Sequence, residues 1–173
     1  EVLLAARNLS KSFRGLKAVN DVSFSVNRGE MLALIGPNGA GKTTCFNLLA
    51  GAMPPDHGAV ILEGQDIIGF RPDQACRAGI GRTFQVVKPF AGLSVLDNVA
   101  VGALNAAKHV SEAKERARAV LSLLDLGHKV DEPASSLTLP DRKRLEVARA
   151  LATEPKLLLL DEVMAGLRPT ECD

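Results

Sequence analysis

The stretch that decides the fold reads Gly36-Pro37-Asn38-Gly39-Ala40-Gly41-Lys42-Thr43-Thr44 and fits the pattern of a phosphate-binding loop, Gly-x-x-x-x-Gly-Lys-Thr. It follows an apolar run, residues 31–35, that predicts a short strand, and it precedes a helix-like stretch, residues 45–50. A glycine-rich turn without a ligand is the alternative. The order strand, loop, helix is the context in which this motif binds a nucleotide, so the sequence predicts such a site.

The residue types of the loop suit a nucleoside triphosphate, which carries several negative charges. Glycines let the backbone wrap around phosphates because no Cβ intrudes, and the following helix adds its positive end. Lys42 is predicted to reach the β- and γ-phosphates, and Thr43 to give its hydroxyl to Mg²⁺. Thr44 either bonds the α-phosphate or only serves the helix N-terminus. The predicted ATP-binding residues of the loop are Gly36, Pro37, Asn38, Gly39, Ala40, Gly41, Lys42, Thr43 and Thr44.

Composition narrows the class of protein. The 173 residues, 46% of them hydrophobic, allow one sizeable core, and a net charge of +1 gives no electrostatic footprint for nucleic acid. Three cysteines are too few and too scattered for a disulfide framework, which favours a reducing, cytoplasmic setting. No segment approaches the roughly 18 consecutive apolar residues of a membrane span. We therefore expect neither nucleic-acid binding nor direct insertion into a membrane.

The remaining pattern predicts an α/β protein. Strands are expected at residues 2–6, 18–26, 31–35, 59–62 and 157–160, and helices at 42–51, 71–78, 93–108, 111–126 and 140–153. Ser111 is predicted to cap the fourth helix and Gly127 to stop it. The expected fold is a P-loop NTPase core with an N-terminal antiparallel β subdomain and an inserted α-helical subdomain. Residues 1–92 and 154–173 would form the core with the β subdomain, and residues 93–153 the helical one.

An acidic pair follows the last predicted strand. A carboxylate at the C-terminal end of a strand beside a phosphate loop can hold Mg²⁺, and Asp161 is assigned that role. Glu162 is predicted to be the general base that polarises the attacking water. A solvated turn after a core strand is the alternative. Gln85 could bind Mg²⁺ or orient water, although on its own a surface glutamine explains it as well.

These motifs, in this order, resemble the nucleotide-binding subunit of an ABC transporter. Gln85 matches the Q-loop glutamine of that family, and Asp161 and Glu162 match its Walker B acids. Residues 142–151 match the helix that follows the family's signature motif, LSGGQ. More narrowly, residues 82–85, 96–99 and 162–167 resemble the ATPases of branched-chain amino acid importers.

The resemblance implies a mechanism and partners. Two such subunits, identical or related, meet head to tail and hold each ATP between one phosphate loop and the partner's signature motif. Closure and hydrolysis drive transmembrane permease subunits, which contact the region around Gln85, so the protein would lie on the inner face of the plasma membrane. The solutes would be branched-chain amino acids or related small polar or amide compounds. Phe13 matches the aromatic residue that stacks on adenine, although a buried Phe at a strand end is the alternative.

The signature motif departs from the family, because this chain reads Leu137-Thr138-Leu139-Pro140-Asp141. Thr138 keeps a hydroxyl and stays a candidate ATP contact. Leu139 and Pro140 replace two glycines, and proline has no N–H to offer a phosphate, although Pro140 suits the first position of a helix. Asp141 would put a negative charge near the γ-phosphate. We therefore expect weakened contacts to the nucleotide of a partner subunit.

The chain also ends before the position of the family's switch histidine. His57, His109 and His128 all precede Asp161, and Arg168 stands where the family has the D-loop aspartate. We expect a C-terminally truncated domain that hydrolyses ATP weakly or not at all by itself. A nucleotide-binding module with little turnover is the alternative. A non-transport ABC ATPase is disfavoured, since residues 93–150 show neither sustained heptads nor a block of charge.

Overall fold

The structure is a computed structural model and describes residues 1–83 and 89–161. The chain divides into two compact units, Glu1–Ile80 and Gly81–Asp173. Elements of the first unit are β1 (Val2–Phe13), β2 (Leu16–Asn27), α1 (Lys42–Leu49), β3 (His57–Leu62), β4 (Gln65–Asp66) and α2 (Pro72–Ala78). From the unit boundary onward the chain forms β5 (Ile80–Arg82), α3 (Val95–Ala103), α4 (Val110–Leu123), two short 3₁₀ helices, η1 (Gly127–Lys129) and η2 (Ala134–Ser136), α5 (Leu139–Leu151) and β6 (Leu157–Leu159).

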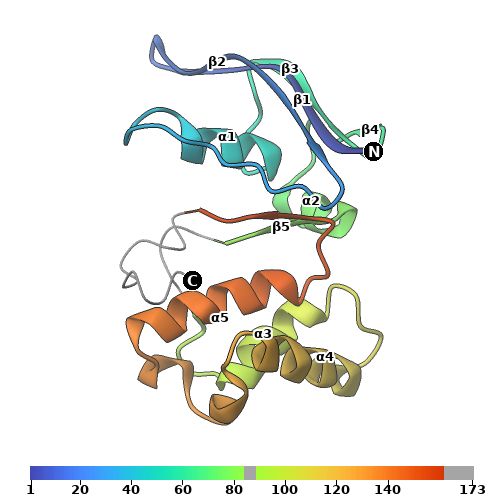
Figure 1. Ribbon diagram of the computed structural model, residues 1–173, viewed down its shortest axis with the longest axis vertical. Helices are drawn as coiled ribbons and strands as arrows, with labels where there is room; N and C mark the ends of the chain where they lie inside the picture. Colours follow the sequence, from blue (N-terminus) through green and yellow to red (C-terminus); the bar gives the residue numbers. More distant parts are fainter. Residues whose placement is uncertain (84–88, 162–173) are drawn as a thin grey trace. The chain divides into compact units, whose positions relative to one another are not determined.

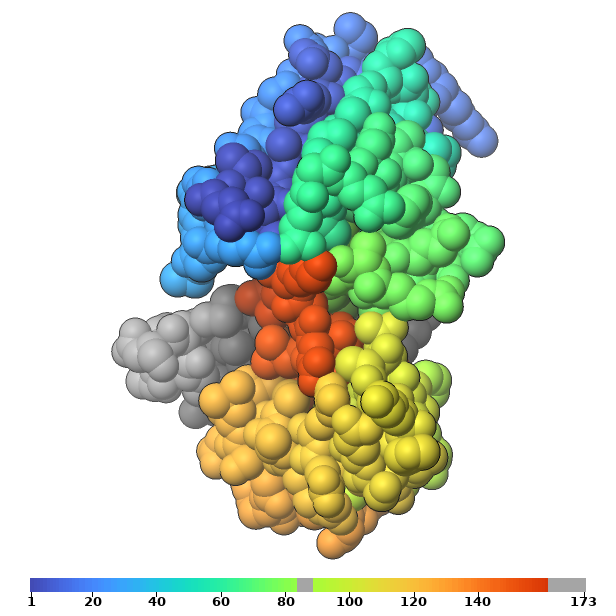
Figure 2. Space-filling model, turned by 90° about the vertical axis from the view of Figure 1, so that its right-hand side faces the viewer, coloured from blue at the N-terminus to red at the C-terminus, as the bar shows by residue number. Residues whose placement is uncertain are grey.

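The first unit is built on a four-stranded antiparallel sheet in the order β2-β1-β3-β4. Figure 2 shows β1 and β3 side by side, in blue and teal. Both hairpins close through two residues with positive φ, Arg14-Gly15 and Glu63-Gly64, because such turns match the twist of the paired strands. Helix α1 runs alongside the sheet (Figure 1). Its buried residues Leu48 and Leu49 join a core that includes Leu4, Leu9, Val19, Val60 and Leu62.

The second unit contains a three-helix cluster, in which α3 contacts both α4 and α5 (Figure 1). Helices α3 and α5 approach closely at Gly102, where an added Cβ would lie only 2.5 Å from the carbonyl oxygen of Arg149. Asn98 is fully buried on α3, and its side-chain amide bonds four backbone groups, at Phe90, Leu93 and Ser94. The shared core consists of Val95, Leu96, Val99, Ala100, Ala103, Ala113, Ala117, Leu121, Leu126, Ala134, Leu137, Leu145, Ala148 and Ala152.

Strands β5 and β6 form a separate two-stranded sheet (Figure 1). The backbone N–H of Thr83 donates to the carbonyl oxygen of Leu159 at 3.0 Å, and the Thr83 hydroxyl donates to the same oxygen at 3.4 Å. The N–H of Asp161 in turn donates to the Thr83 hydroxyl at 3.1 Å. Thr83 therefore fixes the backbone on both sides of Leu160.

Several details of the predicted elements are wrong. Residues 31–35 are not a strand, and Met31 and Ile35 are 99% and 93% exposed. An apolar run marks a segment that can pair, but a strand exists only where a partner supplies hydrogen bonds. Strand β6 is shorter than expected, and Leu160 is 48% exposed rather than buried. Helix α4 begins at Val110, one residue before the predicted start, and His109 rather than Ser111 holds the cap position.

The lengths of the helices also bear on the membrane. Across residues 1–83 and 89–161, every helix is either too short or too polar to cross a bilayer.

Candidate nucleotide-binding site

The phosphate-loop residues lie in the first unit and form a tight turn into α1. The N–H of Ala40 donates to the carbonyl oxygen of Pro37 at 3.1 Å, and Gly39 and Gly41 have φ values of 83° and 88°. A Cβ at Gly41 would lie 2.1 Å from the carbonyl oxygen of Ala18 in β2. Glycine is therefore required at Gly41 both by backbone conformation and by contact with the sheet.

The Lys42 side chain folds back into this turn. Its Nζ donates to the carbonyl oxygens of Gly36 and Pro37, the latter at 2.9 Å. The ammonium is thus held by the loop itself, at the point where the loop begins. Thr43 and Thr44 follow in the first turn of α1 and are half-buried. This arrangement puts one fixed positive charge and a helix N-terminus at the same place, which suits a polyphosphate.

Phe13 lies at the end of the β1–β2 hairpin, paired with Leu16. Ala18, which contacts the loop at Gly41, follows Leu16 by two residues. The Phe13 ring is 43% exposed, so burial does not account for it, and Lys11 Nζ lies 5.9 Å from the ring centroid. An exposed ring at the hairpin end agrees with a stacking surface, and its contact with adenine stays a prediction.

Asp161 belongs to the second unit. Its side chain is 6% exposed and lies 3.7 Å from Nη2 of Arg82, whose side chain is 11% exposed. That distance is too long for a hydrogen bond, and within the described residues Oδ2 of Asp161 has no hydrogen-bond partner. Burial lowers the pKa of the Arg82 guanidinium from its ordinary value, and the nearby Asp161 carboxylate opposes that change.

The orphaned Asp161 oxygen fits a magnesium ligand. A hard cation prefers carboxylate oxygens, and Mg²⁺ commonly takes only one or two of them and fills its other positions with water and phosphate. In the part of the chain that the structure describes, no cluster of three or more His, Cys, Asp or Glu side chains could hold a metal ion. Asp161 is therefore the described residue of the second unit that fits a magnesium ligand, and this role stays a prediction.

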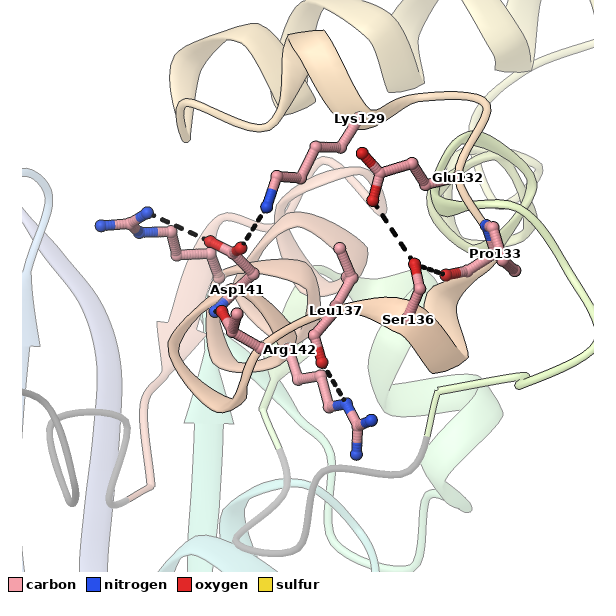
Figure 3. A network of polar contacts seen from close by, with 9 residues as sticks. Lys129, Glu132, Pro133, Ser136, Leu137, Asp141 and Arg142 are labelled. Atoms are coloured by element: carbon pink, nitrogen blue, oxygen red, sulfur yellow. Dashed lines mark hydrogen bonds and ion pairs between the residues drawn. The ribbon is translucent and has the colours of Figure 1, made fainter.

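The altered signature segment leads into α5, and Figure 3 shows part of its polar network, including the bond from Arg142 to the carbonyl oxygen of Leu137. The Thr138 hydroxyl caps the helix by accepting from the N–H of Asp141 at 3.4 Å, and Pro140 is the second helical residue rather than the first. Arg142 binds back to the segment that precedes the helix, donating to the carbonyl oxygens of Leu137 and Ser135 at 2.9 and 2.8 Å.

The Asp141 carboxylate does not stand free, contrary to the expectation from sequence. The residue is only 8% exposed, and its carboxylate accepts from Lys129 Nζ at 2.7 Å (Figure 3). It also accepts from Arg144 at 3.3 Å. Burial pushes its pKa upward, but the hydrogen bonds from Lys129 and Thr138 and the charges of Lys129 and Arg144 outweigh burial, so the pKa lies below its ordinary value. The negative charge is neutralised within the unit.

Other predicted residues lie elsewhere. Gln85, Glu162 and Arg168 fall outside the described residues. Sequence reasoning also missed Arg82 and Lys129, whose acidic partners are known only once the fold brings distant positions together. Arg82 could have been considered because it stands in the stretch Arg82-Thr83-Phe84-Gln85, but in that stretch only the glutamine was assigned a role.

Known proteins with similar sequences belong to the ABC transporter family. The ABC transporter family model matches residues 19–165. The chain is 41% identical over 167 residues to the lipopolysaccharide export system ATP-binding protein LptB of Escherichia coli (strain K12), covering 96% of this chain and 69% of LptB. It is 39% identical over 184 residues to the high-affinity branched-chain amino acid transport ATP-binding protein LivG of Salmonella typhimurium (strain LT2), covering 98% of this chain and 72% of LivG.

Solved structures show the same fold. The ADP conformation of MJ1267, an ATP-binding cassette of an ABC transporter, matches 99% of this chain and 73% of that chain, with a TM-score of 0.88 and 34% identity. The chain also spans only 62% of the length of an ABC transporter ATP-binding protein, R00382, of Rhizobium meliloti (strain 1021), to which it is 40% identical over 96% of its own residues. The predicted α/β P-loop fold is confirmed by these cassettes. With a family model that matches most of its residues and relatives near 40% identity, this chain belongs to the ABC transporter family, as an ATP-binding domain.

Proposed function

We propose that the chain binds Mg-ATP and hydrolyses it as the nucleotide-binding subunit of an ABC importer. The observation that carries the proposal is the phosphate loop, in which Lys42 Nζ is held against Gly36 and Pro37 and Gly41 is packed on Ala18. The loop therefore keeps the Lys42 ammonium beside the turn, where it can exchange the two carbonyl oxygens for phosphate oxygens.

Each predicted residue has a role in this proposal. Lys42 moves from the loop carbonyls to the β- and γ-phosphates, while Phe13 stacks on the base. Thr43, Asp161 and Gln85 hold Mg²⁺, which neutralises charge on the transferring phosphoryl group. Glu162 accepts a proton from the attacking water. The residues of the first unit thus bind and orient ATP, and those of the second act on its γ-phosphate.

The proposed solutes are branched-chain amino acids or related small polar or amide compounds. The support is the resemblance of residues 82–85, 96–99 and 162–167 to importer ATPases, together with the LivG relative. LptB, whose name describes an export system, is equally similar, so overall identity does not favour either direction of transport. A test is uptake of labelled leucine by cells lacking the gene: wild type should restore it, and E162Q should not.

The proposed partners are a second ATPase subunit, identical or related, and transmembrane permease subunits at the inner face of the plasma membrane. A cassette from Clostridium perfringens that is 30% identical is described as part of the ABC transporter complex cbiONQ. We propose that this chain works in a complex of the same kind, with residues 1–92 and 154–173 as the core and residues 93–153 as the helical subdomain. Permease co-purification from membranes tests the proposal.

Steady-state ATP hydrolysis by the full encoded protein tests the catalytic assignment. E162Q should lower turnover by about 100-fold or more while ATP still binds, since a general base contributes on that order. E154Q is the matched control, because Glu154 is an exposed glutamate with an ion pair to Arg116. Equal turnover in E162Q and wild type would remove Glu162 from the mechanism, and loss of ATP binding in E162Q would make its role structural.

A second function has its own supporting observation. Leu139 and Pro140 offer side chains where glycines are usual in the family, and Asp141 is bound internally by Lys129 and Arg144. A signature segment with two added side chains and an internally paired carboxylate favours a module that binds ATP with little turnover. Tight ATP binding to the wild-type dimer without hydrolysis would support this second function over the first. T138A discriminates further, because unchanged dimer-dependent turnover would exclude a catalytic role for Thr138.

A further inference from the structure

The pair formed by Arg82 and Asp161 carries an inference that rests on the proposed binding of Mg-ATP. The two residues are brought together by the backbone. Thr83 bonds Leu159 through its N–H and hydroxyl, and Asp161 bonds back to the Thr83 hydroxyl at 3.1 Å. Arg82 and Asp161 therefore flank one short, fully bonded junction between β5 and the end of β6. The hydrogen bonds between the two segments, rather than contacts of surface side chains, therefore bring Arg82 and Asp161 together.

The contact itself is incomplete. Nη2 of Arg82 and Oδ2 of Asp161 are 3.7 Å apart in a place where the two side chains are 11% and 6% exposed. Buried ion pairs stabilise a fold only when hydrogen bonds satisfy both groups, and Oδ2 lacks one within the described residues. The guanidinium compensates the charge of Asp161 but leaves one oxygen with acceptor capacity. A cation that binds this oxygen directly would therefore stabilise it more than the guanidinium does at 3.7 Å.

We propose that Arg82 is a positioning residue that serves as the counter-charge of Asp161 when magnesium is absent, and that it yields the carboxylate when Mg-ATP binds. Both cations favour the same carboxylate, so they compete for it. Arg82 then keeps the metal-free chain folded and at the same time lowers the affinity of the site for Mg²⁺. The magnesium dependence of ATP binding is set by this exchange.

The experiment compares ATP affinity in excess Mg²⁺ with ATP affinity in EDTA, using a fluorescent ATP analogue on the full encoded protein. The ratio of the two affinities is the magnesium gain. R82M should raise this gain by about fivefold, the order of coupling between residues in contact, because the competing charge is gone. It should also lower the melting temperature in EDTA. R82K keeps the charge and should give the wild-type gain.

Two controls separate this exchange from simpler explanations. R77M makes the same substitution at an arginine whose side chain is 64% exposed, and it should leave the gain unchanged. D161N should abolish the gain, with or without R82M. If R82M lowers the melting temperature but leaves the gain at its wild-type value, Arg82 is only a structural partner and the proposal fails. A gain that falls in R82M would also overturn it, because Arg82 would then assist the metal.

A measurement on the wild-type protein covers the case in which R82M does not fold. The ¹⁵N resonance of Arg82 Nε, assigned by its loss in R82K, should shift between ATP with EDTA and Mg-ATP. An unchanged resonance would mean that the pair persists with metal bound and would overturn the exchange. Failure of ATP to bind in EDTA and in Mg²⁺ alike would instead overturn the proposed function, and this inference with it.

Discussion

At the scale of single residues, the phosphate loop requires glycine for two different reasons, backbone conformation at Gly39 and, in addition, close contact with β2 at Gly41. Both have positive φ, but a Cβ at Gly41 would meet the Ala18 carbonyl oxygen at 2.1 Å, whereas nothing lies within 4 Å of a Cβ at Gly39. G39A should therefore carry only the backbone strain, on the order of 1–2 kcal/mol. G41A should cost that amount and about 1–3 kcal/mol more from overpacking.

Urea unfolding of both variants gives the measurement. Because G41A adds a steric clash to the backbone strain, its free energy of unfolding should be clearly lower than that of G39A. Equal losses would show that the loop shifts away from β2 at little cost and that the contact with Ala18 is not a constraint.

At the scale of elements, the ion pair between Lys129 and Asp141 ties η1 to the start of α5. K129M would leave the buried Asp141 without its closest partner, and we expect a larger loss in the free energy of unfolding than for an exposed pair. K114M is the matched control, because Lys114 pairs with Asp97 at 3.0 Å with both side chains about 40% exposed. The control should lose less than about 1 kcal/mol, as exposed pairs do.

The same pair has a predictable dependence on pH. The pKa of Asp141 lies below its ordinary value of 3.8, so the unfolded chain takes up this proton at higher pH than the folded chain. The stabilisation is fully present above that ordinary value and is lost as the pH falls through the lower folded value. The difference in stability between wild type and D141N, followed in urea, should therefore be constant near neutral pH and shrink in acid. A difference that instead grows as the pH falls would contradict the direction of the shift.

The elements also show why sequence predicts some features and not others. Local patterns predicted the start of α5 to within one residue, but they misplaced the cap of α4, because His109 rather than Ser111 holds that position. The run at residues 31–35 has the composition of a buried strand, but pairing is a property of distant segments. Arg82 and Lys129 were missed for the same reason, because each pairs with a carboxylate that is distant in sequence, Asp161 and Asp141 respectively. The phosphate loop was predictable because its whole motif is contiguous.

At the scale of the whole molecule, each unit has its own hydrophobic core. Leu9 in the first unit and Leu121 in the second are both fully buried, so L9A and L121A are matched deletions that should each cost about 2–5 kcal/mol. Without nucleotide, we expect two calorimetric transitions, since domains with separate cores need not unfold together. L9A should lower one transition and L121A the other. A single transition that both variants shift equally would show that the chain unfolds as one cooperative body.

The position of Lys42 has a consequence for the heat of nucleotide binding. Its ammonium already donates to two loop carbonyls, so a phosphate does not create those hydrogen bonds but exchanges them. The enthalpy released should then be smaller than a count of contacts in the complex would suggest. Much of the driving force would come from the entropy of water and counter-ions released from the triphosphate. Titration calorimetry of this chain would therefore record a modest heat, even for a ligand that binds tightly.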